Sequence, residues 1–210
     1  MAGEGFARVE KPLRLLRPVP AYLLLTGSLE RGDVNVMAAS WVVPTSRRPP
    51  RVGVVLDKSS YSLALARKYG WLVIGVVDVT MAELVKFVGT RSGREVDKVG
   101  VTGLKIAPSP VDPSIPVPRD ALAYLVLHVD SEVDLGPTVL LNCSIAYAAA
   151  RQGLYRNEGG WDLGRAKVLL HKAKHSFTTP CSDEVYVIRT PWGVAVKKPW
   201  RRLFESQDEE

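Results

Sequence analysis

The chain has 210 residues, of which 46% are hydrophobic, which is enough for one sizeable core and argues against two large domains. No stretch approaches the roughly 20 apolar residues of a membrane span, and the N-terminal residues lack a signal peptide's apolar segment, so we expect a soluble, cytoplasmic protein. The net charge of +6 would suit nucleic acid, but the basic residues are dispersed and no aromatic stripe accompanies them, which favours a solvated surface over nucleic-acid binding.

The first third of the chain is predicted to be rich in strands. Residues 21–26, 34–43 and 51–56 are rich in Leu, Val and Ala, and clusters of Gly or Pro separate them. This pattern is typical of strands joined by turns, so we expect these three strands to form a meander. A further apolar strand is predicted over residues 71–77.

Two short helices are predicted beside these strands. Ser62 is suited to cap a helix over residues 62–69, and Gly70 follows where a helix stop is expected. A Thr-x-x-Glu sequence that begins at Thr80 has the spacing of a capping box, which predicts a second helix over residues 81–88.

The second half of the chain is predicted to contain two hairpins and one extended loop. Residues 121–133 and 138–151 are long apolar runs joined by Asp-Leu-Gly-Pro, which indicates a hairpin. The stretch 105–118 carries five prolines and is expected to be an extended loop. Residues 185–188 and 194–196 flank Thr-Pro-Trp-Gly and predict a last hairpin.

The long hairpin over residues 121–151 is apolar on both faces of its strands. Burial on two sides indicates a barrel wall that is also covered from outside. Because an exposed apolar outer face would be an association surface, we expect a homodimer. The fold class predicted from these elements is mainly β, a small barrel with two or three short helices on its rim.

Small residues dominate the segment GDVNVMAASW over residues 32–41. A strand built only for burial would favour β-branched and aromatic side chains. Small side chains allow a flat ligand to approach the backbone, and Asn35 and Ser40 can add side-chain donors and acceptors. The alternative is a tightly packed strand crossing.

Two polar segments have the composition of anion sites. Residues 57–62, Asp-Lys-Ser-Ser-Tyr-Ser, follow a predicted strand and open a helix, where hydroxyls, an ammonium and backbone N–H groups converge. Residues 90–98 form a second polar loop, in which Arg94 or Lys98 could reach an anion. The alternatives are an ordinary serine cap with a solvated lysine, and an exposed charged loop.

The histidines and cysteines carry weaker signals. His171 and His175 lie close together, which suits proton handling or a nicotinamide contact, but two histidines without a third ligand do not indicate a metal. Cys143 and Cys181 lack metal-ligand and Cys-x-x-Cys spacing, so we expect packing residues and leave open whether they pair. Only three Asn and two Gln occur, a thermophile-like composition.

The order of these motifs resembles the flavin reductase-like, FMN-binding split-barrel family, especially its flavoredoxin-like branch. The series runs from Gly-x-Val-Asn-x-Met-Ala-Ala-Ser-Trp through the hydroxylated helix start to Ser-Gly-Arg-x-x-Asp-Lys, and later to a Leu-His pair. The resemblance implies an antiparallel split β-barrel of Greek-key type over residues 15–182. Residues 1–14 would then be an N-terminal extension, and residues 183–210 a C-terminal hairpin and charged tail.

The resemblance also implies a set of cofactor-binding residues. Each is carried over at its matching position in this chain. The small-residue strand would face the ring and ribityl chain of FMN through Asn35, Met37, Ala38, Ser40 and Trp41. The FMN phosphate would lie at the helix start, near Lys58, Ser59, Tyr61 and Ser62, and the second loop would close over the cofactor with Ser92, Gly93, Arg94 and Lys98. His171 would orient a nicotinamide.

The function implied by the resemblance is an FMN-dependent oxidoreductase. It would take electrons from NADH or NADPH and pass them to free flavin, ferric iron or a partner protein, as a homodimer. The alternatives are a flavoredoxin-like electron carrier that reacts poorly with nicotinamides, and a basic nucleic-acid-binding β-barrel. No side-chain nucleophile is required, because the flavin carries the redox chemistry.

Overall fold

The computed structural model describes residues 7–180, 184–188 and 195–199. Strands predominate in this part of the chain, which also holds three α-helices, α1 (Tyr61–Tyr69), α2 (Ala82–Thr90) and α3 (Lys98–Thr102). The predicted class, mainly β with two or three short helices, is therefore confirmed. None of the helices in these ranges has the length and apolar character needed to cross a membrane.

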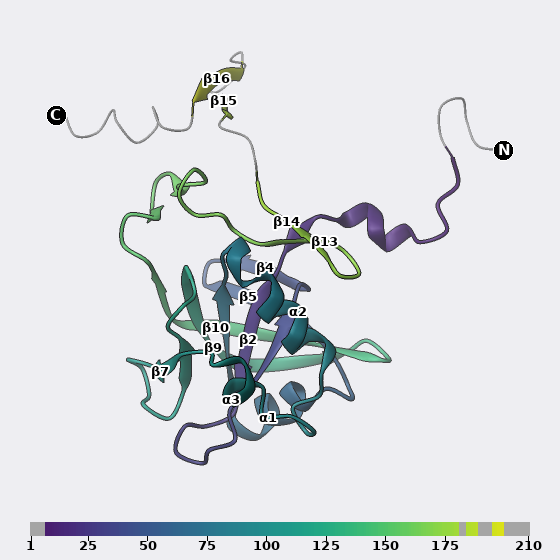
Figure 1. The fold of residues 1–210 in the computed structure, drawn as a ribbon, viewed down its shortest axis with the longest axis vertical. Helices are drawn as coiled ribbons and strands as arrows, with labels where there is room; N and C mark the ends of the chain where they lie inside the picture. Colours follow the sequence, from purple (N-terminus) through teal and green to yellow (C-terminus); the bar gives the residue numbers. More distant parts are fainter. Residues whose placement is uncertain (1–6, 181–183, 189–194, 200–210) are drawn as a thin grey trace.

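Seven antiparallel strands form the central sheet, in the order β3-β2-β6-β9-β10-β5-β4 (Figure 1). Their bounds are β2 (Tyr22–Thr26), β3 (Asn35–Ala39), β4 (Val42–Arg47), β5 (Pro50–Asp57), β6 (Trp71–Val76), β9 (Ala123–Asp134) and β10 (Thr138–Ala150). The outermost strands β3 and β4 are separated in sequence only by Ser40 and Trp41. This short link requires the two edges to approach each other, so the sheet rolls into an incompletely closed barrel.

The first three predicted strands do not form a meander. The expected strand over residues 34–43 is divided into β3, which pairs with β2, and β4, which pairs with β5 at the opposite edge of the sheet. At the division, the Val55 N–H donates to the Trp41 carbonyl at 2.9 Å. The chain therefore changes edges at residues 40–41, because its hydrogen-bonding partner changes there.

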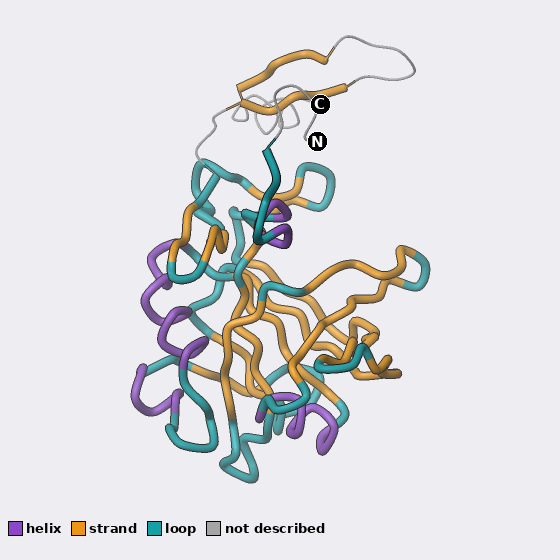
Figure 2. The backbone as a smooth tube through the Cα atoms, turned by 90° about the vertical axis from the view of Figure 1, so that its right-hand side faces the viewer, coloured by secondary structure: helices purple, strands orange, loops and turns teal. Residues whose placement is uncertain are grey.

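Two hydrophobic clusters lie on the two faces of the sheet. Strand β2 divides its side chains between them, since Leu24 joins the cluster that includes α1 and its neighbours Leu23 and Leu25 join the cluster that includes α2. Every residue of β6 is buried, because this strand lies between the two clusters. Figure 2 shows helices along one side and at one end of the strand layer. The helices thus cover the faces that the sheet leaves apolar.

The predicted helix caps are wrong in detail. Helix α1 is capped by Ser60, whose hydroxyl accepts from the Leu63 N–H at 3.1 Å, and Ser62 is buried inside the first turn. Before α2, the 3-10 helix Val79–Met81 begins at Asp78, whose carboxylate accepts from the Thr80 N–H. That start replaces the expected capping box, and α2 has no side-chain cap of its own.

The long hairpin of β9 and β10 is confirmed, with paired residues from Val139 to Ala150. The expected burial on two faces is wrong for its outer half. Burial decreases along β9 after Leu127, and residues 130–134 are all exposed. Three of these five residues are acidic, so this end of the strand is solvated instead of packed.

Several short strand pairs complete the fold. The proline-rich stretch holds the antiparallel pair β7 (Ile106–Pro108) and β8 (Pro116–Pro118), where an extended loop was expected. The other short strands are β1 (Val19–Pro20), β11 (Tyr155–Arg156), β12 (Gly160–Trp161), β13 (Leu170–Ala173), β14 (Ser176–Thr178), β15 (Glu184–Ile188) and β16 (Ala195–Pro199). A short 3-10 helix, η1 (Pro12–Leu16), precedes β1.

The C-terminal pair β15 and β16 is antiparallel and confirms the predicted last hairpin, although its turn lies outside the described residues. A separate three-stranded sheet is formed by β1, β13 and β14. Strand β13 is anchored next to the central sheet, because the Leu169 N–H donates to the Val77 carbonyl and the Ala21 N–H donates to the Leu169 carbonyl. This places the β13–β14 hairpin beside β3 and α2.

Candidate functional site

Two cavities lie along strand β3, and Gly89 of α2 lines both. The first, which we call the loop cavity, has a volume of about 220 Å³. Its lining residues are Asn35, Met37, Ser59, Ser60, Tyr61, Ser62, Val88, Gly89, Arg91, Ser92, Gly93, Arg94 and Lys98. The second, the hairpin cavity, has a volume of about 280 Å³. Its lining residues are Ala21, Ala38, Ala39, Ser40, Val85, Lys86, Gly89, Thr90, His171, Lys174, His175 and Phe177.

The two cavities together contain most of the residues singled out in the sequence. Nine of them line the loop cavity, namely Asn35, Met37, Ser59, Tyr61, Ser62, Ser92, Gly93, Arg94 and Lys98. Ala38, Ser40 and His171 line the hairpin cavity instead. Both polar segments and the small-residue strand therefore converge on one region, which none of them indicates alone.

Two predicted residues line neither cavity. Trp41 lies past the end of β3, with its side chain about half exposed. The Lys58 ammonium donates to an Asp134 carboxylate oxygen at 2.6 Å, on the tip of the β9–β10 hairpin. Lys58 is therefore directed away from the loop cavity by a long-range ion pair.

A buried hydrogen bond joins β3 to α1. The Asn35 side-chain amide donates to the Ser62 hydroxyl at 2.7 Å, and both residues are buried. The bond satisfies a polar group that would otherwise be costly to bury, and it fixes the wall of the loop cavity. This explains why Ser62 is not the helix cap, since its hydroxyl has a partner in another element.

We expect Ser62→Ala to lower the free energy of unfolding by about 1–3 kcal/mol, because the buried Asn35 amide would lose its acceptor. Urea unfolding followed by circular dichroism measures this change. The matched control is Ser131→Ala at the exposed end of β9, which should change stability by less than about 0.5 kcal/mol. Equal effects of the two substitutions would contradict the structural role of the Asn35–Ser62 bond.

Gly93 is packed directly against Asn35 and Tyr61. A Cβ atom added at Gly93 would lie 2.0 Å from the Asn35 side-chain oxygen and 3.0 Å from a Tyr61 ring carbon. Only a residue without a side chain fits there. The loop after α2 therefore closes tightly over the buried Asn35–Ser62 pair.

Arg94 ties the same loop to the start of α1. Its Nη1 donates to the Ser59 carbonyl at 2.8 Å, and its guanidinium lies 5.2 Å from the centre of the Tyr61 ring. The other guanidinium N–H groups remain able to bind an anion. Ser59 itself is engaged, since its N–H and hydroxyl both donate to the Asp57 carboxylate.

Lys98 closes the far side of the loop cavity and is 4% exposed. Its ammonium donates to the carbonyls of Val88 and Arg91, at 3.1 and 3.2 Å, at the C-terminal end of α2. Cations are favoured at that end of a helix dipole. Burial nevertheless lowers the pKa of Lys98 to about 8.

The low pKa of Lys98 predicts a stability that rises with pH. The pKa of lysine in an unfolded chain is about 10.4, whereas the pKa of Lys98 in the fold is lowered to about 8. Between these values the unfolded state binds more protons, so the free energy of unfolding increases as pH rises, by about 3 kcal/mol in all. Lys98→Met should remove this rise. If the difference in the free energy of unfolding between wild type and variant stayed constant from about pH 7 to about pH 10.5, the lowered pKa of Lys98 would be contradicted.

His171 has both ring nitrogens engaged in the structure. Nη1 of Arg17 lies 2.7 Å from Nδ1 and 2.9 Å from Nε2, and Nε2 lies 3.1 Å from the Lys174 carbonyl. A guanidinium can only donate and a carbonyl can only accept, so Nδ1 accepts and Nε2–H donates. Burial lowers the pKa of His171, with Arg17 and His175 acting in the same direction and the Lys174 carbonyl opposing. The ring is therefore held neutral.

The remaining reactive groups in the described residues are not arranged as a metal site. Within the described part of the chain, no group of three or more His, Cys, Asp or Glu residues is placed to hold a metal ion. Cys143 lies in the core cluster next to α1, where burial raises the pKa of its thiol to about 12. Cys181 lies outside the described residues.

Sequence reasoning missed several lining residues of the hairpin cavity, chiefly Lys86, Gly89, Lys174 and Phe177. Gly89 faces β3, since an added Cβ would lie 2.9 Å from the Ala38 Cβ, and Lys86 is exposed one turn earlier on α2. Lys86, Gly89 and Lys174 belong to no recognised motif. The one available signal is the basic sequence His-Lys-Ala-Lys-His, whose two lysines lie between the histidines.

Comparison with known proteins identifies a family model, the flavin reductase-like domain, that matches residues 16–177. Two curated relatives are uncharacterised proteins. One, from Pyrococcus abyssi, is 31% identical over 175 residues, with 82% of this chain and 96% of the relative covered. The other, YddH from Escherichia coli, is 30% identical over 171 residues, with 79% and 89% covered.

Three solved structures share the fold. Flavoredoxin from Methanosarcina acetivorans has a TM-score of 0.70 at 23% identity, covering 79% of this chain and 86% of that one. An FMN-binding protein from Thermus thermophilus with bound 1-cyclohex-2-enone has a TM-score of 0.71 at 21% identity, covering 86% and 96%. A Shewanella frigidimarina protein described as a flavin reductase with a split-barrel domain has a TM-score of 0.74 at 15% identity, covering 90% and 100%.

Proposed function

The chain belongs to the flavin reductase-like domain family, which supports a flavin-related oxidoreductase role, and from this premise we propose that it binds FMN along β3. In this proposal the protein passes electrons from NADH or NADPH through FMN to free flavin, ferric iron or a partner protein. The observation that carries the proposal is the convergence of nine predicted site residues on the loop cavity. Family membership does not favour the nucleic-acid alternative.

The residues present fit the chemical parts of FMN. The loop cavity supplies the Arg94 guanidinium and the buried Lys98 ammonium, which suit a phosphate. Gly89 joins this cavity to the hairpin cavity, where the small side chains of Ala38 and Ala39 leave the backbone of β3 approachable. A flat ring system and an anionic group therefore have adjoining places.

The chain's own contribution is to bind and to orient. When bound, FMN supplies the hydride and electron chemistry. Arg94 would hold the phosphate, while the buried Asn35–Ser62 pair and Gly93 would keep β3 at a constant distance from the loop. Asn35 and Met37 would meet the ribityl chain and ring, with Ser40 at the far end of the strand.

Anaerobic reduction tests the proposal. Purified full-length protein mixed with FMN should acquire the visible flavin spectrum and retain it through gel filtration. NADH or NADPH added without oxygen should then bleach that spectrum, and an added acceptor should restore it. Protein that stays colourless in excess FMN would contradict the proposal.

A second candidate, a flavoredoxin-like electron carrier that reacts poorly with nicotinamides, is favoured by one observation. Both ring nitrogens of His171 are occupied, by Arg17 and by the Lys174 carbonyl, so neither is available to orient a nicotinamide. The same anaerobic experiment separates the candidates. A carrier would bind FMN but would bleach only slowly with NADH or NADPH, while a chemical reductant would bleach it at once.

We also propose that the protein is a homodimer whose flavin reductase-like domain spans residues 15–182. In the short 3-10 helix η1, Leu13, Leu15 and Leu16 are 66%, 69% and 72% exposed, an apolar patch that association would cover. Light scattering coupled to gel filtration measures the mass directly. A monomeric mass at micromolar concentration would contradict the dimer.

A further inference from the structure

Arg17 joins the N-terminal segment to the β13–β14 hairpin. Residues 7–18 are exposed apart from Arg17, which is partly buried. Its Nη1 lies 2.7 Å from Nδ1 of His171, the residue that pairs with Val19 across β1 and β13. A cation of the N-terminal segment is thus fastened to the ring of a hairpin residue that lies 154 positions later in the chain.

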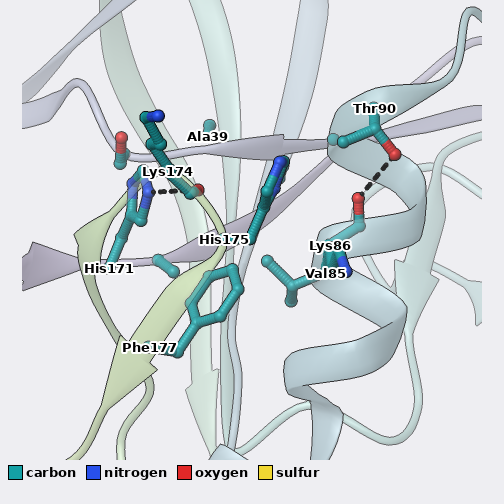
Figure 3. A pocket seen from close by; sticks show the side chains of 12 residues that line it. Ala39, Val85, Lys86, Thr90, His171, Lys174, His175 and Phe177 are labelled. Carbon is teal, nitrogen blue, oxygen red and sulfur yellow. Dashed lines mark hydrogen bonds between the residues drawn. The ribbon is translucent and has the colours of Figure 1, made fainter.

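His171 connects this contact to the turn between β13 and β14. Its Nε2–H donates to the Lys174 carbonyl at 3.1 Å (Figure 3). Among the described residues, Lys174 is the only non-glycine with a positive φ, of 44°. A left-handed backbone is unfavourable for a residue with a side chain, so the turn needs a contact that keeps it in this conformation. The bond from His171 supplies that contact.

His171 also packs against Phe177, its partner across the two strands of the hairpin. Their ring centres lie 5.4 Å apart. Phe177 in turn packs against the hydrophobic cluster that includes Val85 of α2. His171 therefore contacts both the turn and the aromatic side chain of the hairpin. We call Arg17, His171 and the Lys174 carbonyl the hairpin clasp.

The hairpin held by this clasp forms one wall of the hairpin cavity. Lys174, His175 and Phe177 line the cavity from the hairpin, and Val85 lines it from α2 (Figure 3). The small side chain of Ala38 lines the same cavity from β3. In the proposed function, the flavin ring lies in this cavity. The position of the hairpin therefore sets the width of the space that is left for the ring.

We propose that Arg17 and His171 are positioning residues for the flavin ring. They act through the hairpin, because the clasp keeps the turn and the Phe177 ring where the flavin ring fits between the hairpin and β3. The inference rests on the proposed function and deepens it. It gives His171 a role other than the nicotinamide contact expected from the sequence, and it gives Arg17 a role that no motif indicates.

The clasp acts on the ring of the flavin and not on its phosphate. None of the clasp residues lines the loop cavity, where the phosphate is proposed to lie beside Arg94. FMN and riboflavin carry the same ring and differ by the phosphate. Loss of the clasp should therefore weaken both flavins by the same factor, whereas loss of a phosphate contact would weaken FMN alone.

Fluorescence titration of the full-length protein with FMN and with riboflavin tests the clasp, in the variants Arg17→Met and His171→Leu. Each variant should bind both flavins about fivefold more weakly or worse, because the hairpin position that fits the ring would be populated for about a fifth of the time or less. The preference for FMN over riboflavin should stay unchanged. The visible circular dichroism of the bound flavin should also change, since it reports the surroundings of the ring.

Two further variants separate positioning from general stability. Arg14→Met removes an exposed cation of η1 that lines neither cavity, three residues before Arg17, and should leave both affinities unchanged. His171→Gln keeps one acceptor and one donor, so it should restore most of the affinity that His171→Leu loses. Arg17 belongs to none of the hydrophobic clusters, so Arg17→Met should fold and provides the test even if His171→Leu does not.

Unchanged affinity for both flavins in a folded clasp variant would overturn the inference, as would equal losses in Arg14→Met and Arg17→Met. A loss confined to FMN would overturn the assignment to the ring. Failure of the proposed function is recognised in the wild type. Wild-type protein that binds neither flavin refutes the flavin role and the clasp together, whereas wild-type protein that binds both flavins no better than the clasp variants do refutes the clasp alone.

Discussion

Gly93→Ala is expected to weaken FMN binding by at least about a hundredfold, which corresponds to about 2.7 kcal/mol. The added Cβ would lie 2.0 Å from the Asn35 side-chain oxygen, far inside van der Waals contact. Either the Asn35 side chain shifts, which breaks its buried bond to Ser62, or the loop after α2 shifts, which pulls Arg94 away from the Ser59 carbonyl. Fluorescence titration of the variant with FMN measures the loss.

The control for this substitution is Gly160→Ala. Gly160 has a positive φ of 74° but no atom within 4 Å of its added Cβ, and it lines neither cavity. Alanine there should cost some stability through backbone strain while FMN affinity stays unchanged. If both variants lost FMN affinity equally, general destabilisation and not closure of the loop cavity would be responsible.

Arg94→Gln is expected to remove most of the preference for FMN over riboflavin, which differ only by the phosphate. In the proposed site, the exposed Arg94 guanidinium is bonded to the Ser59 carbonyl just before α1, and a charged hydrogen bond contributes about 1.5–3 kcal/mol. FMN affinity should therefore decrease about 10- to 100-fold, while riboflavin affinity decreases far less. Parallel titrations with the two flavins measure both changes.

Lys58→Gln separates the structural assignment of the phosphate site from the one expected from the sequence. Lys58 was predicted to bind the phosphate, but its ammonium pairs with Asp134 and it lines neither cavity. We expect its substitution to leave both flavin affinities unchanged. A loss of FMN affinity in Lys58→Gln that matched the loss in Arg94→Gln would show that the phosphate lies outside the loop cavity.

Local sequence carried enough information to predict elements whose partners are near in the chain. The β9–β10 hairpin follows from two apolar runs and a four-residue turn, and the glycine after α1 marks the end of that helix. The predicted cap of α1 was wrong because several neighbouring hydroxyls could each cap the helix. Ser60 and Ser62 are both acceptable N-caps, and only the long-range bond from Asn35 decides which of them turns inward.

Charged side chains show the same dependence on distant partners. From the sequence, Lys58 is expected at the phosphate, and Arg94 is expected only in the loop that closes over the cofactor. Asp134 engages Lys58 because the β9–β10 hairpin pairs with β5 and brings its tip beside the end of that strand. Arg94 instead crosses to the Ser59 carbonyl and the Tyr61 ring at the start of α1.

The sequence by itself determined the fold class, the family and most residues of the loop cavity, because these depend on hydrophobic pattern, turn residues and short motifs that act over a few positions. The tertiary structure alone decided which hydroxyl is buried, which cation faces the loop cavity and that a second, cationic cavity exists at all. Lys86 of α2 and Lys174 of the β13–β14 turn line one cavity, and β13 is held there by its pairing with β1. The positions of charged residues follow no periodic pattern in the sequence. Which of them come together is therefore set by strand pairing between distant segments.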